Sequence, residues 1–274
     1  MTVSFELPKL AFLFPENSDN AGDWKIIPIG LDKKFISEVF CKKFFITKKT
    51  AGGILKPRKK FSHKGNYGHA LLICGSHGKI GAAVLAARAC LRSGAGLATV
   101  HIPKCGYEIL QTAIPEAMVS VDESEHIITT LPGLEKYNAI GIGPGIGTEK
   151  QTQNTLKLLI QNSSVPIVID ADGINIIAEN KTWLSFIPKQ SILTPHPKEF
   201  ERLTGKSSGD FERMQKQIDL AKKFNCYVIL KGAHTCIACP DGDAFFNSTG
   251  NPGMATGGTG DVLTGILTGL LAQK

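Results

Sequence analysis

The sequence of 274 residues lacks any apolar run that could cross a membrane. Charged or polar residues interrupt each hydrophobic stretch well before about 18 positions, which excludes a transmembrane helix. Residues 1–6 also lack the basic start and the apolar core of a secretory signal peptide. We therefore expect no membrane partner.

The sequence also lacks a disulfide framework. Its cysteines are odd in number and widely scattered, at positions 41, 74, 90, 105, 226, 236 and 239. This pattern argues for a reducing compartment, and we expect a cytoplasmic protein. Cys236 and Cys239 have no second Cys or His pair at zinc-like spacing, so we interpret them as ordinary cysteines in a hairpin arm before the turn 240–243.

The excess of basic charge is confined to one tract. The net charge is +7, but residues 33–64 contain eleven Lys or Arg and one acid, Glu38, so the rest of the chain is slightly acidic. Because Gly and Pro punctuate this tract, a solvated linker is favoured, with an attracted polyphosphate ligand as the alternative. Basic residues spread over a folded face would indicate nucleic acid binding, and we predict none.

Hydrophobic residues at 42% and charged residues at 20% are typical of globular proteins and exclude bulk disorder. Apolar runs predict strands, and apolar residues at helical spacing lie between several of them, as in 84–91 and 214–224. This alternation predicts an α/β fold with a central, mostly parallel sheet and helices on both faces, and a ligand at the carboxyl ends of the strands. The predicted strands are 70–74, 97–102, 139–142, 166–170, 191–194 and 227–231.

The two ends of the sequence differ from this body. Residues 10–14 and 24–29 predict two strands, which cannot bury a core by themselves. We expect residues 1–31 to stand apart from the ligand cleft. At the other end, a glycine-rich segment opens an apolar helix over 262–271 and no closing element follows. Both ends look cut.

Glycine-rich turns follow the first and third of these strands. In residues 75–82 the spacing is G-x-x-G-x-x-G, which fits neither the dinucleotide fingerprint nor a Walker A loop, so an anion site and a structural turn both stay open. Residues 141–148 carry glycine at alternate positions, which allows close backbone approach to a ligand or only tight packing.

Candidate polar groups follow two further strands. Asp170 and Asp172 could hold Mg²⁺ through water or cap the following helix, and the cap is slightly favoured. His196 lies between two prolines that fix its backbone direction, which suits a ligand contact, with a hydrogen-bonded surface histidine as the alternative.

The strongest signal is the segment 251–263, in which Gly257, Gly258, Thr259 and Gly260 precede Asp261 at a helix start. Exposed N–H groups there form an anion hole for a phosphate. An acid beside such a hole is what phosphorylation of a hydroxyl requires, because it can accept the hydroxyl proton.

Together these motifs resemble the ribokinase-like superfamily and, within it, the ADP/ATP-dependent NAD(P)H-hydrate dehydratases. The resemblance covers 62–274 through the segments 62–65, 75–82, 94–97, 143–147, 170–172, 194–200, 231–235 and 257–261. Residues 1–31 resemble the last strands of a hydrate epimerase domain, and 32–61 form the basic linker. Most of the epimerase domain and the closing helices of the dehydratase are absent from this sequence, so we expect no epimerase activity.

The resemblance implies roles for residues of this sequence. Asp261 takes the proton of the C6 hydroxyl of the hydrate and also contacts the substrate, as do Ala82, Gly145 and His196. The nucleotide, ADP or ATP, is held by Lys231, Gly232, Ala233, His234, Thr235, Gly257, Gly258, Thr259 and Gly260. Mg²⁺ is expected to bridge the phosphates, with unknown protein ligands.

The resemblance thus implies a lyase that restores NADH or NADPH from its hydrate, and a homo-oligomer, a tetramer in the intact protein. Two alternatives stay open. One is a small-molecule hydroxyl kinase that uses the same Gly-Asp loop, and the other is an inactive nucleotide-binding fragment.

Overall fold

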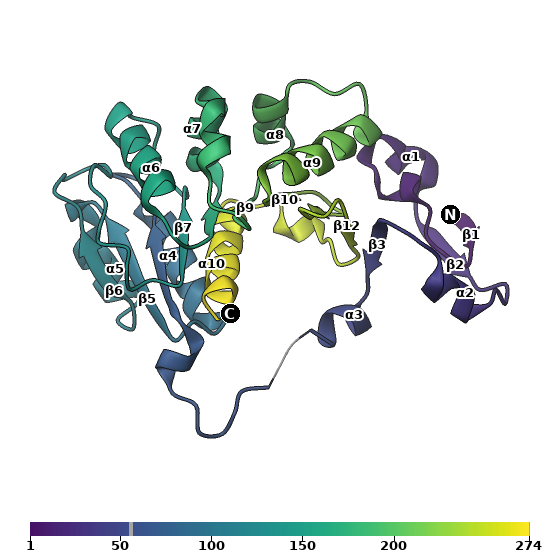
Figure 1. Ribbon diagram of the computed structural model, residues 1–274, viewed down its shortest axis with the longest axis horizontal. Helices are drawn as coiled ribbons and strands as arrows, with labels where there is room; N and C mark the ends of the chain where they lie inside the picture. Colours follow the sequence, from purple (N-terminus) through teal and green to yellow (C-terminus); the bar gives the residue numbers. More distant parts are fainter. Residues whose placement is uncertain (55–56, 274) are drawn as a thin grey trace.

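A computed structural model describes residues 1–54 and 57–273 of the chain (Figure 1). Leu55 and Lys56 of the expected linker, and Lys274, lie outside the described residues. The strands are β1 (Thr2–Phe5), β2 (Trp24–Ile27), β3 (Lys43–Ile46), β4 (His69–Ile73), β5 (Leu97–Ile102), β6 (Met118–Val121), β7 (Ala139–Ile142), β8 (Ile167–Ile169), β9 (Ile192–Leu193), β10 (Tyr227–Leu230), β11 (Cys236–Ala238) and β12 (Ala244–Asn247).

The helices alternate with these strands along most of the chain. They are α1 (Ser18–Ala21), α2 (Lys33–Glu38), α3 (Lys48–Gly52), α4 (Ile80–Arg92), α5 (Tyr107–Ala113), α6 (Lys150–Asn162), α7 (Ala171–Glu179), α8 (Pro197–Thr204), α9 (Asp210–Phe224) and α10 (Thr259–Ala272). Short 3₁₀ helices are η1 (Leu10–Leu13), η2 (Pro15–Asn17), η3 (Lys64–Tyr67), η4 (Lys104–Gly106), η5 (Lys181–Phe186) and η6 (Pro252–Met254).

Ten strands of the described residues form one sheet in the order β3-β12-β11-β10-β9-β8-β7-β4-β5-β6. All neighbours are parallel except β10 with β11 and β11 with β12, which form the expected hairpin arm. From β4 the chain first builds outward through β5 and β6, then returns to β7 on the other side of β4 and continues to β10. The strand order therefore reverses between β4 and β7, where open α/β sheets bind their ligands.

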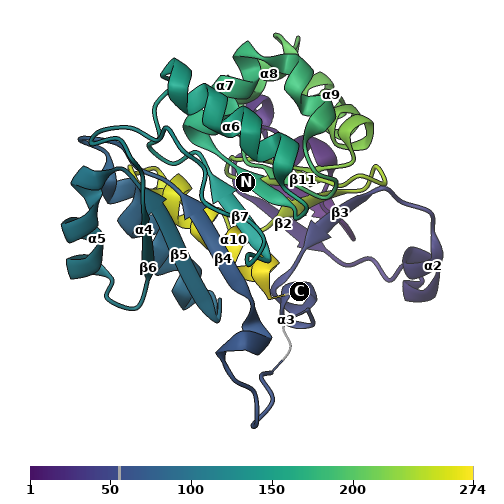
Figure 2. The same ribbon diagram turned by 60° about the vertical axis from the view of Figure 1, so that its left-hand side comes forward.

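Helices cover both faces of the sheet, as predicted (Figure 2). On one face α6 to α9 pack on apolar residues such as Ile140 and Ile142, and on the other α4, α5 and α10 pack on Leu72 and Val100. Strands buried on both sides need continuous apolar runs, which explains why these strands are recognisable in the sequence.

Helix α10 lies close to both α4 and the sheet because glycine and threonine line it. A Cβ on Gly265 would lie 2.1 Å from the carbonyl oxygen of Ala86, and one on Gly269 would lie 2.6 Å from that of Cys90. Gly141 of β7 has the same role, because a Cβ there would lie 2.3 Å from Thr268 Oγ1. Packing thus accounts for this glycine of the 141–148 segment.

The N-terminal segment differs from its prediction. Within the predicted strand 10–14, residues Leu10–Leu13 form η1 instead, because periodicity cannot distinguish so short an apolar run, closed by Pro15, from a helical turn. The second predicted strand is present as the shorter β2, which pairs in parallel with β1. In Figure 1 this segment lies beside α9 and β12 at the right of the molecule.

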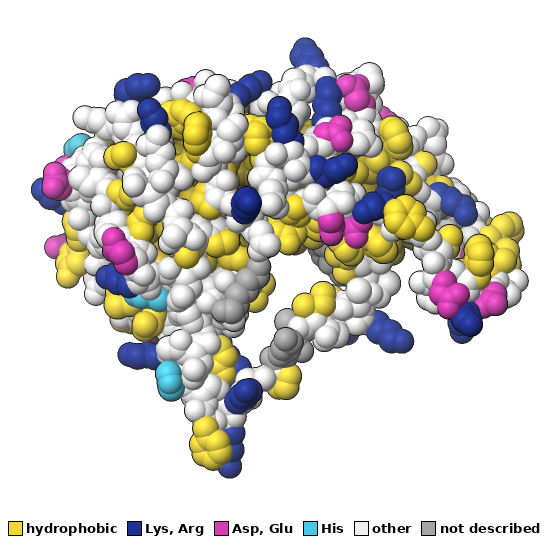
Figure 3. Space-filling view, viewed as in Figure 1, with side chains coloured by type: hydrophobic (Ala, Val, Ile, Leu, Met, Phe, Trp, Pro, Cys, Tyr) yellow, Lys and Arg dark blue, Asp and Glu magenta, His cyan; other side chains and the backbone are white. Residues whose placement is uncertain are grey.

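The basic tract also differs from a plain linker. Its strand β3 pairs in parallel with β12, and Phe44 stacks on Phe245 with ring centroids 4.9 Å apart. Residues 32–61 therefore contribute an edge strand to the main sheet. Figure 3 shows Lys and Arg side chains scattered over the visible face rather than gathered in one patch. No helix of the described residues is long and apolar enough to cross a membrane.

Candidate active site

Two glycine-rich turns meet at the point where the strand order reverses. The N–H of Gly75 donates to the carbonyl of Pro144 (2.8 Å), and Ser76 Oγ donates to the carbonyl of Gly145 (2.7 Å). A Cβ on Gly145 would lie 3.2 Å from the Cβ of Ala82. The structure thus brings together two of the residues that were expected to contact the hydrate.

Asp170 and Asp172 follow β8 and have different partners. Asp170 is 1% exposed, and its Oδ1 lies 2.8 Å from Lys231 Nζ while its Oδ2 accepts a hydrogen bond from Thr264 Oγ1 (2.9 Å). Asp172 Oδ2 accepts from the N–H of Gly147 (2.9 Å) and lies 3.6 Å from Lys79 Nζ. Neither side chain caps α7, so the favoured cap interpretation is wrong.

Ala171, between these aspartates, has a φ of +46°. This left-handed conformation is unfavourable for a residue with a Cβ, by about 1–2 kcal/mol. Gly143 lies directly against this turn, because a Cβ added to Gly143 would lie 1.8 Å from the carbonyl oxygen of Asp170. The strained turn therefore fixes the direction in which the two carboxylates leave β8.

Lys231 follows β10 and joins two acidic groups. Besides its ion pair with Asp170, its Nζ lies 3.9 Å from Glu199 Oε2 on α8. Glu199 is 4% exposed, and burial raises the pKa of its carboxyl. Lys231 is thus bound to protein carboxylates as well as lying in the expected nucleotide motif.

His196 is the N-cap of α8. Its Nδ1 accepts hydrogen bonds from the N–H groups of Lys198 (3.1 Å) and Glu199 (3.2 Å), and Glu199 Oε2 accepts from the N–H of His196 (2.7 Å). Its Nε2 lies 3.4 Å from Glu199 Oε1, and the side chain is 44% exposed. Capping therefore assigns the proton to Nε2 and fixes the ring, while the substrate contact stays a prediction.

The turn Lys231–Thr235 is closed by its own side chains. Thr235 Oγ1 accepts from the N–H of Gly232 (3.3 Å) and donates to its carbonyl (3.0 Å), and His234 Nδ1 lies 3.0 Å from the carbonyl of Asn247. Leu13 and Phe14 line a cavity of about 80 Å³ together with Lys231, Gly232, Ala233 and His234. Leu13 and Phe14 thus lie beside the expected nucleotide turn, while the expectation that residues 1–31 stand apart from the ligand cleft stays a prediction.

Helix α10 begins at the glycine-rich segment, as predicted. Gly258 is its N-cap with φ +93°, and a Cβ there would lie 2.6 Å from Leu85 Cδ1. Thr259, Gly260 and Asp261 form the first turn, whose N–H groups have no partner within the helix. An added Cβ on Gly260 would lie 3.4 Å from Asp170 Oδ2 and 3.8 Å from Lys231 Nζ. The first turn of α10 therefore packs against the Asp170–Lys231 ion pair.

Asp261 is partly buried in this first turn. Burial raises the pKa of its carboxyl, the Asp170 and Asp172 charges raise it further, and the Lys231 ammonium opposes them. Beneath it, burial and then the Asp261 charge raise the pKa of the Cys74 thiol, so this thiol is neutral. A carboxylate with a raised pKa at a helix N-terminus is suited to accept a proton near a bound phosphate.

Within the described ranges, no group of three or more His, Cys, Asp or Glu side chains is placed to hold a metal ion. Asp170 and Asp172 are occupied by Lys231, Thr264, Gly147 and Lys79. The residues at this edge therefore fit a cation that arrives with the phosphates better than a resident metal.

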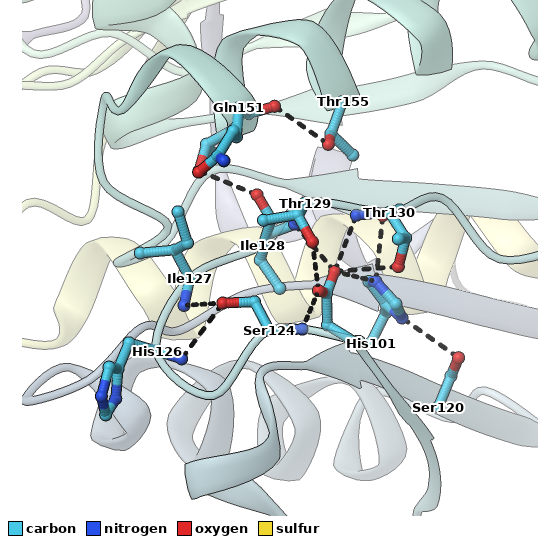
Figure 4. Close-up of polar contacts among 12 residues, drawn as sticks. His101, Ser120, Ser124, His126, Ile127, Ile128, Thr129, Thr130, Gln151 and Thr155 are labelled. Carbon is cyan, nitrogen blue, oxygen red and sulfur yellow. Dashed lines mark hydrogen bonds and ion pairs between the residues drawn. The ribbon is translucent and has the colours of Figure 1, made fainter.

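A buried polar cluster missed in the sequence holds the loop beside the first glycine turn (Figure 4). His101 Nε2 lies 3.1 Å from Asp122 Oδ2, and Asp122 also accepts hydrogen bonds from the N–H groups of Ser124, Thr129 and Thr130. The loop reaches the turn through His126, whose carbonyl accepts from the N–H of His77 (2.8 Å). No motif signals this cluster, because its residues come from β5, β6 and an irregular segment.

Comparison with known proteins identifies the family. The model of the NAD(P)H-hydrate dehydratase family matches residues 70–274. The chain belongs to this family. Among curated members, the ADP-dependent (S)-NAD(P)H-hydrate dehydratase of Staphylococcus aureus is 38% identical over 84% of this chain and 82% of that protein. The corresponding enzyme of Lactococcus lactis is 34% identical over 83% of this chain and 82% of its own length.

Longer relatives align with the N-terminal segment as well. The bifunctional NAD(P)H-hydrate repair enzyme of Moorella thermoacetica is 35% identical over 99% of this chain and 53% of its own length. The chain thus spans about half the length of these relatives. The fold agrees with the ADP/ATP-dependent NAD(P)H-hydrate dehydratase of Bacillus subtilis, co-crystallised with ATP and Mg²⁺, at a TM-score of 0.68 and 31% identity over 84% of this chain and 85% of that one.

Proposed function

We propose that this chain catalyses the nucleotide-dependent dehydration of hydrated NADH or NADPH to NADH or NADPH. ADP or ATP is consumed to AMP or ADP and phosphate. The observation that carries the proposal is the position of Asp261, on the first turn of a glycine-led helix and against the Asp170–Lys231 ion pair. This arrangement combines an anion hole with a proton acceptor.

The proposed reaction has two stages. Asp261 accepts the proton of the C6 hydroxyl while the oxygen attacks the terminal phosphorus of the nucleotide, which makes a phosphate ester at C6 and releases AMP or ADP. The lone pair of the ring nitrogen then expels phosphate, and loss of the C5 proton restores the dihydropyridine ring. Phosphorylation is needed because hydroxide is a poor leaving group.

The remaining residues are proposed to bind and orient the two substrates. Ala82, Gly145 and His196 contact the hydrate. This assignment is supported by the contact between the two glycine-rich turns and by the fixed ring of His196. Lys231–Thr235 and Gly257–Gly260 hold the nucleotide, whose transferring phosphate takes hydrogen bonds from the first turn of α10. Mg²⁺ enters with the nucleotide and neutralises phosphate charge.

We also propose the following wider properties. Residues 62–274 form the dehydratase domain and residues 1–31 are the end of an epimerase domain. The protein is cytoplasmic and assembles into a homo-oligomer, a tetramer in its intact form. Size-exclusion chromatography with light scattering tests the oligomer.

The function is tested by incubating the chain with hydrated NADH and either ADP or ATP. We expect recovery of NADH absorbance with one phosphate released for each NADH formed. A stable phosphorylated product without NADH recovery would identify a hydroxyl kinase. Nucleotide binding without turnover would identify a nucleotide-binding protein instead. The ratio of rates with ADP and ATP identifies the donor.

A further inference from the structure

The Asp170–Lys231 ion pair is the most deeply placed charged group of the site. Asp170 follows β8 and Lys231 follows β10, so the pair crosses over β9 at the carboxyl edge of the sheet. Asp170 is 1% exposed, whereas the Lys231 side chain retains 24% of its exposure. A buried carboxylate requires such a partner, because an unpaired charge is strongly disfavoured away from water.

The pair touches α10 at two levels. Thr264 Oγ1 donates to Asp170 Oδ2 one turn into the helix, and Gly260 lies over the ion pair in the first turn. Asp261 directly follows Gly260 and lies between these two contacts in the sequence. Its carboxyl is therefore carried on a helical turn that rests on one negative and one positive protein group.

We propose that Asp170 and Lys231 form a positioning unit that holds the first turn of α10, and with it Asp261, against the carboxyl edge of the sheet. This inference rests on the proposed function for the reaction that Asp261 serves. It assigns Lys231 an electrostatic task within the protein, in addition to the expected contact with the nucleotide.

The other charged groups around Asp261 do not replace this pair. Asp172 lies on α7 and is balanced by Lys79 at 3.6 Å. Glu199 on α8 lies 3.9 Å from Lys231 Nζ, and Cys74 after β4 is a neutral thiol. Lys231 is thus the cation that opposes Asp170 at Asp261. Removing either member of the pair leaves the charge of the other uncompensated. The two removals should therefore change the pKa of Asp261 in opposite directions.

The test uses the full chain and four variants: Lys231→Met, Asp170→Asn, Lys231→Arg and Lys216→Met. Lys216 is the control, because it forms a partly exposed pair with Glu212 within α9, away from the site. Two quantities are measured for each protein. They are the acidic midpoint of the pH profile of kcat/KM for NADH recovery, and the titration midpoint of the Asp261 carboxyl by ¹³C NMR, assigned through Asp261→Asn.

We expect Lys231→Met to move both midpoints to higher pH and Asp170→Asn to move them to lower pH, each by about one unit. Lys231→Arg and Lys216→Met should leave them in place. Midpoints that do not move, or that move in the same direction in both charge-removing variants, would overturn the inference. If Lys231→Met does not fold, the midpoints of the isosteric variant Asp170→Asn are compared with those of Lys231→Arg, and this comparison still tests the inference.

The two readouts separate this inference from the proposed function. NMR midpoints that move as expected in a chain without dehydratase activity would refute the function and retain the ion pair's effect on Asp261. Normal dehydratase activity of the chain, together with midpoints that do not move in the variants, would support the proposed function and refute the inference.

Discussion

Lys231 and Asp170 form a 2.8 Å ion pair although 61 residues separate them in the sequence. Both follow strands of the same parallel sheet, so their side chains emerge at the same edge. Glu199 and Thr264 extend the contact to α8 and α10. The ion pair thus joins four motifs that the sequence presents separately: 170–172, 194–200, 231–235 and 257–261.

Asp261→Asn should abolish turnover while nucleotide binding is retained. Asparagine keeps the size of the side chain but cannot accept the hydroxyl proton, and loss of a general base typically lowers the rate by about 10²–10⁴. The backbone N–H groups of 257–260 remain in place. Initial rates of NADH recovery and the Kd for ADP check this. A rate loss below about tenfold would exclude Asp261 as the base, and a joint loss of rate and affinity would indicate a structural role.

Gly143→Ala should destabilise the protein far more than Gly78→Ala. Both glycines have positive φ, +128° and +79°, but a Cβ at 143 would lie 1.8 Å from the carbonyl oxygen of Asp170, whereas nothing lies within 4 Å of one at 78. We expect a loss above about 4 kcal/mol at 143 and about 1 kcal/mol at 78. Urea denaturation measures both. Equal losses would mean that the Asp170 turn can move aside.

Asp122→Asn should destabilise the protein near neutral pH and less so in acid. Although burial opposes ionisation, hydrogen bonds led by that from Thr129 lower the pKa of Asp122 to about 2, below its unfolded value. The stabilisation, about 2 kcal/mol, is therefore complete above the unfolded pKa and is lost as pH falls toward 2. The free energies of unfolding of wild type and variant should therefore converge as pH falls from about 5 toward 2. A pH-independent difference would contradict this.

Glu16→Ala should weaken the start of α9, far away in the sequence. Glu16 Oε2 accepts a hydrogen bond from the N–H of Asp210 (2.8 Å), and Asp210 Oδ2 accepts from the N–H of Glu16 (2.9 Å). Glu16 thus acts as a cap where Gly209, the N-cap, has no side chain. Loss of a cap costs about 1–2 kcal/mol, measured by thermal or urea denaturation. The exposed Asp19→Ala is the control, and an equal effect there would refute the capping role.

The sequence was sufficient to predict the body of the fold. The six predicted strands correspond to β4, β5, β7, β8, β9 and β10, and the helix after Gly260 is α10. These elements are recognisable because burial on both faces requires continuous apolar runs. The short edge strands β3 and β6 were missed, since four residues carry too little pattern, and β3 also lies within a basic tract.

The site was only partly predictable, for a physical reason. Motifs that end neighbouring strands indicate which residues share an edge, and this brought Ala82 near Gly145 and Lys231 near the start of α10. Motifs do not indicate which oxygen meets which donor. The pairing of Asp170 with Lys231 and Thr264, and the cap formed by His196, depend on backbone angles such as the positive φ of Ala171.

The pairing of β3 with β12 has a consequence for biosynthesis. An early strand pairs with one of the last, and α10 packs against β4, β7 and β8. Because a ribosome releases the N-terminal part first, β3 and the α10 side of the early sheet emerge long before their partners. Such non-local pairing slows folding and leaves an unpaired strand and apolar surface open to aggregation meanwhile. We therefore expect the nascent chain to depend on chaperones until the residues of α10 have been synthesised.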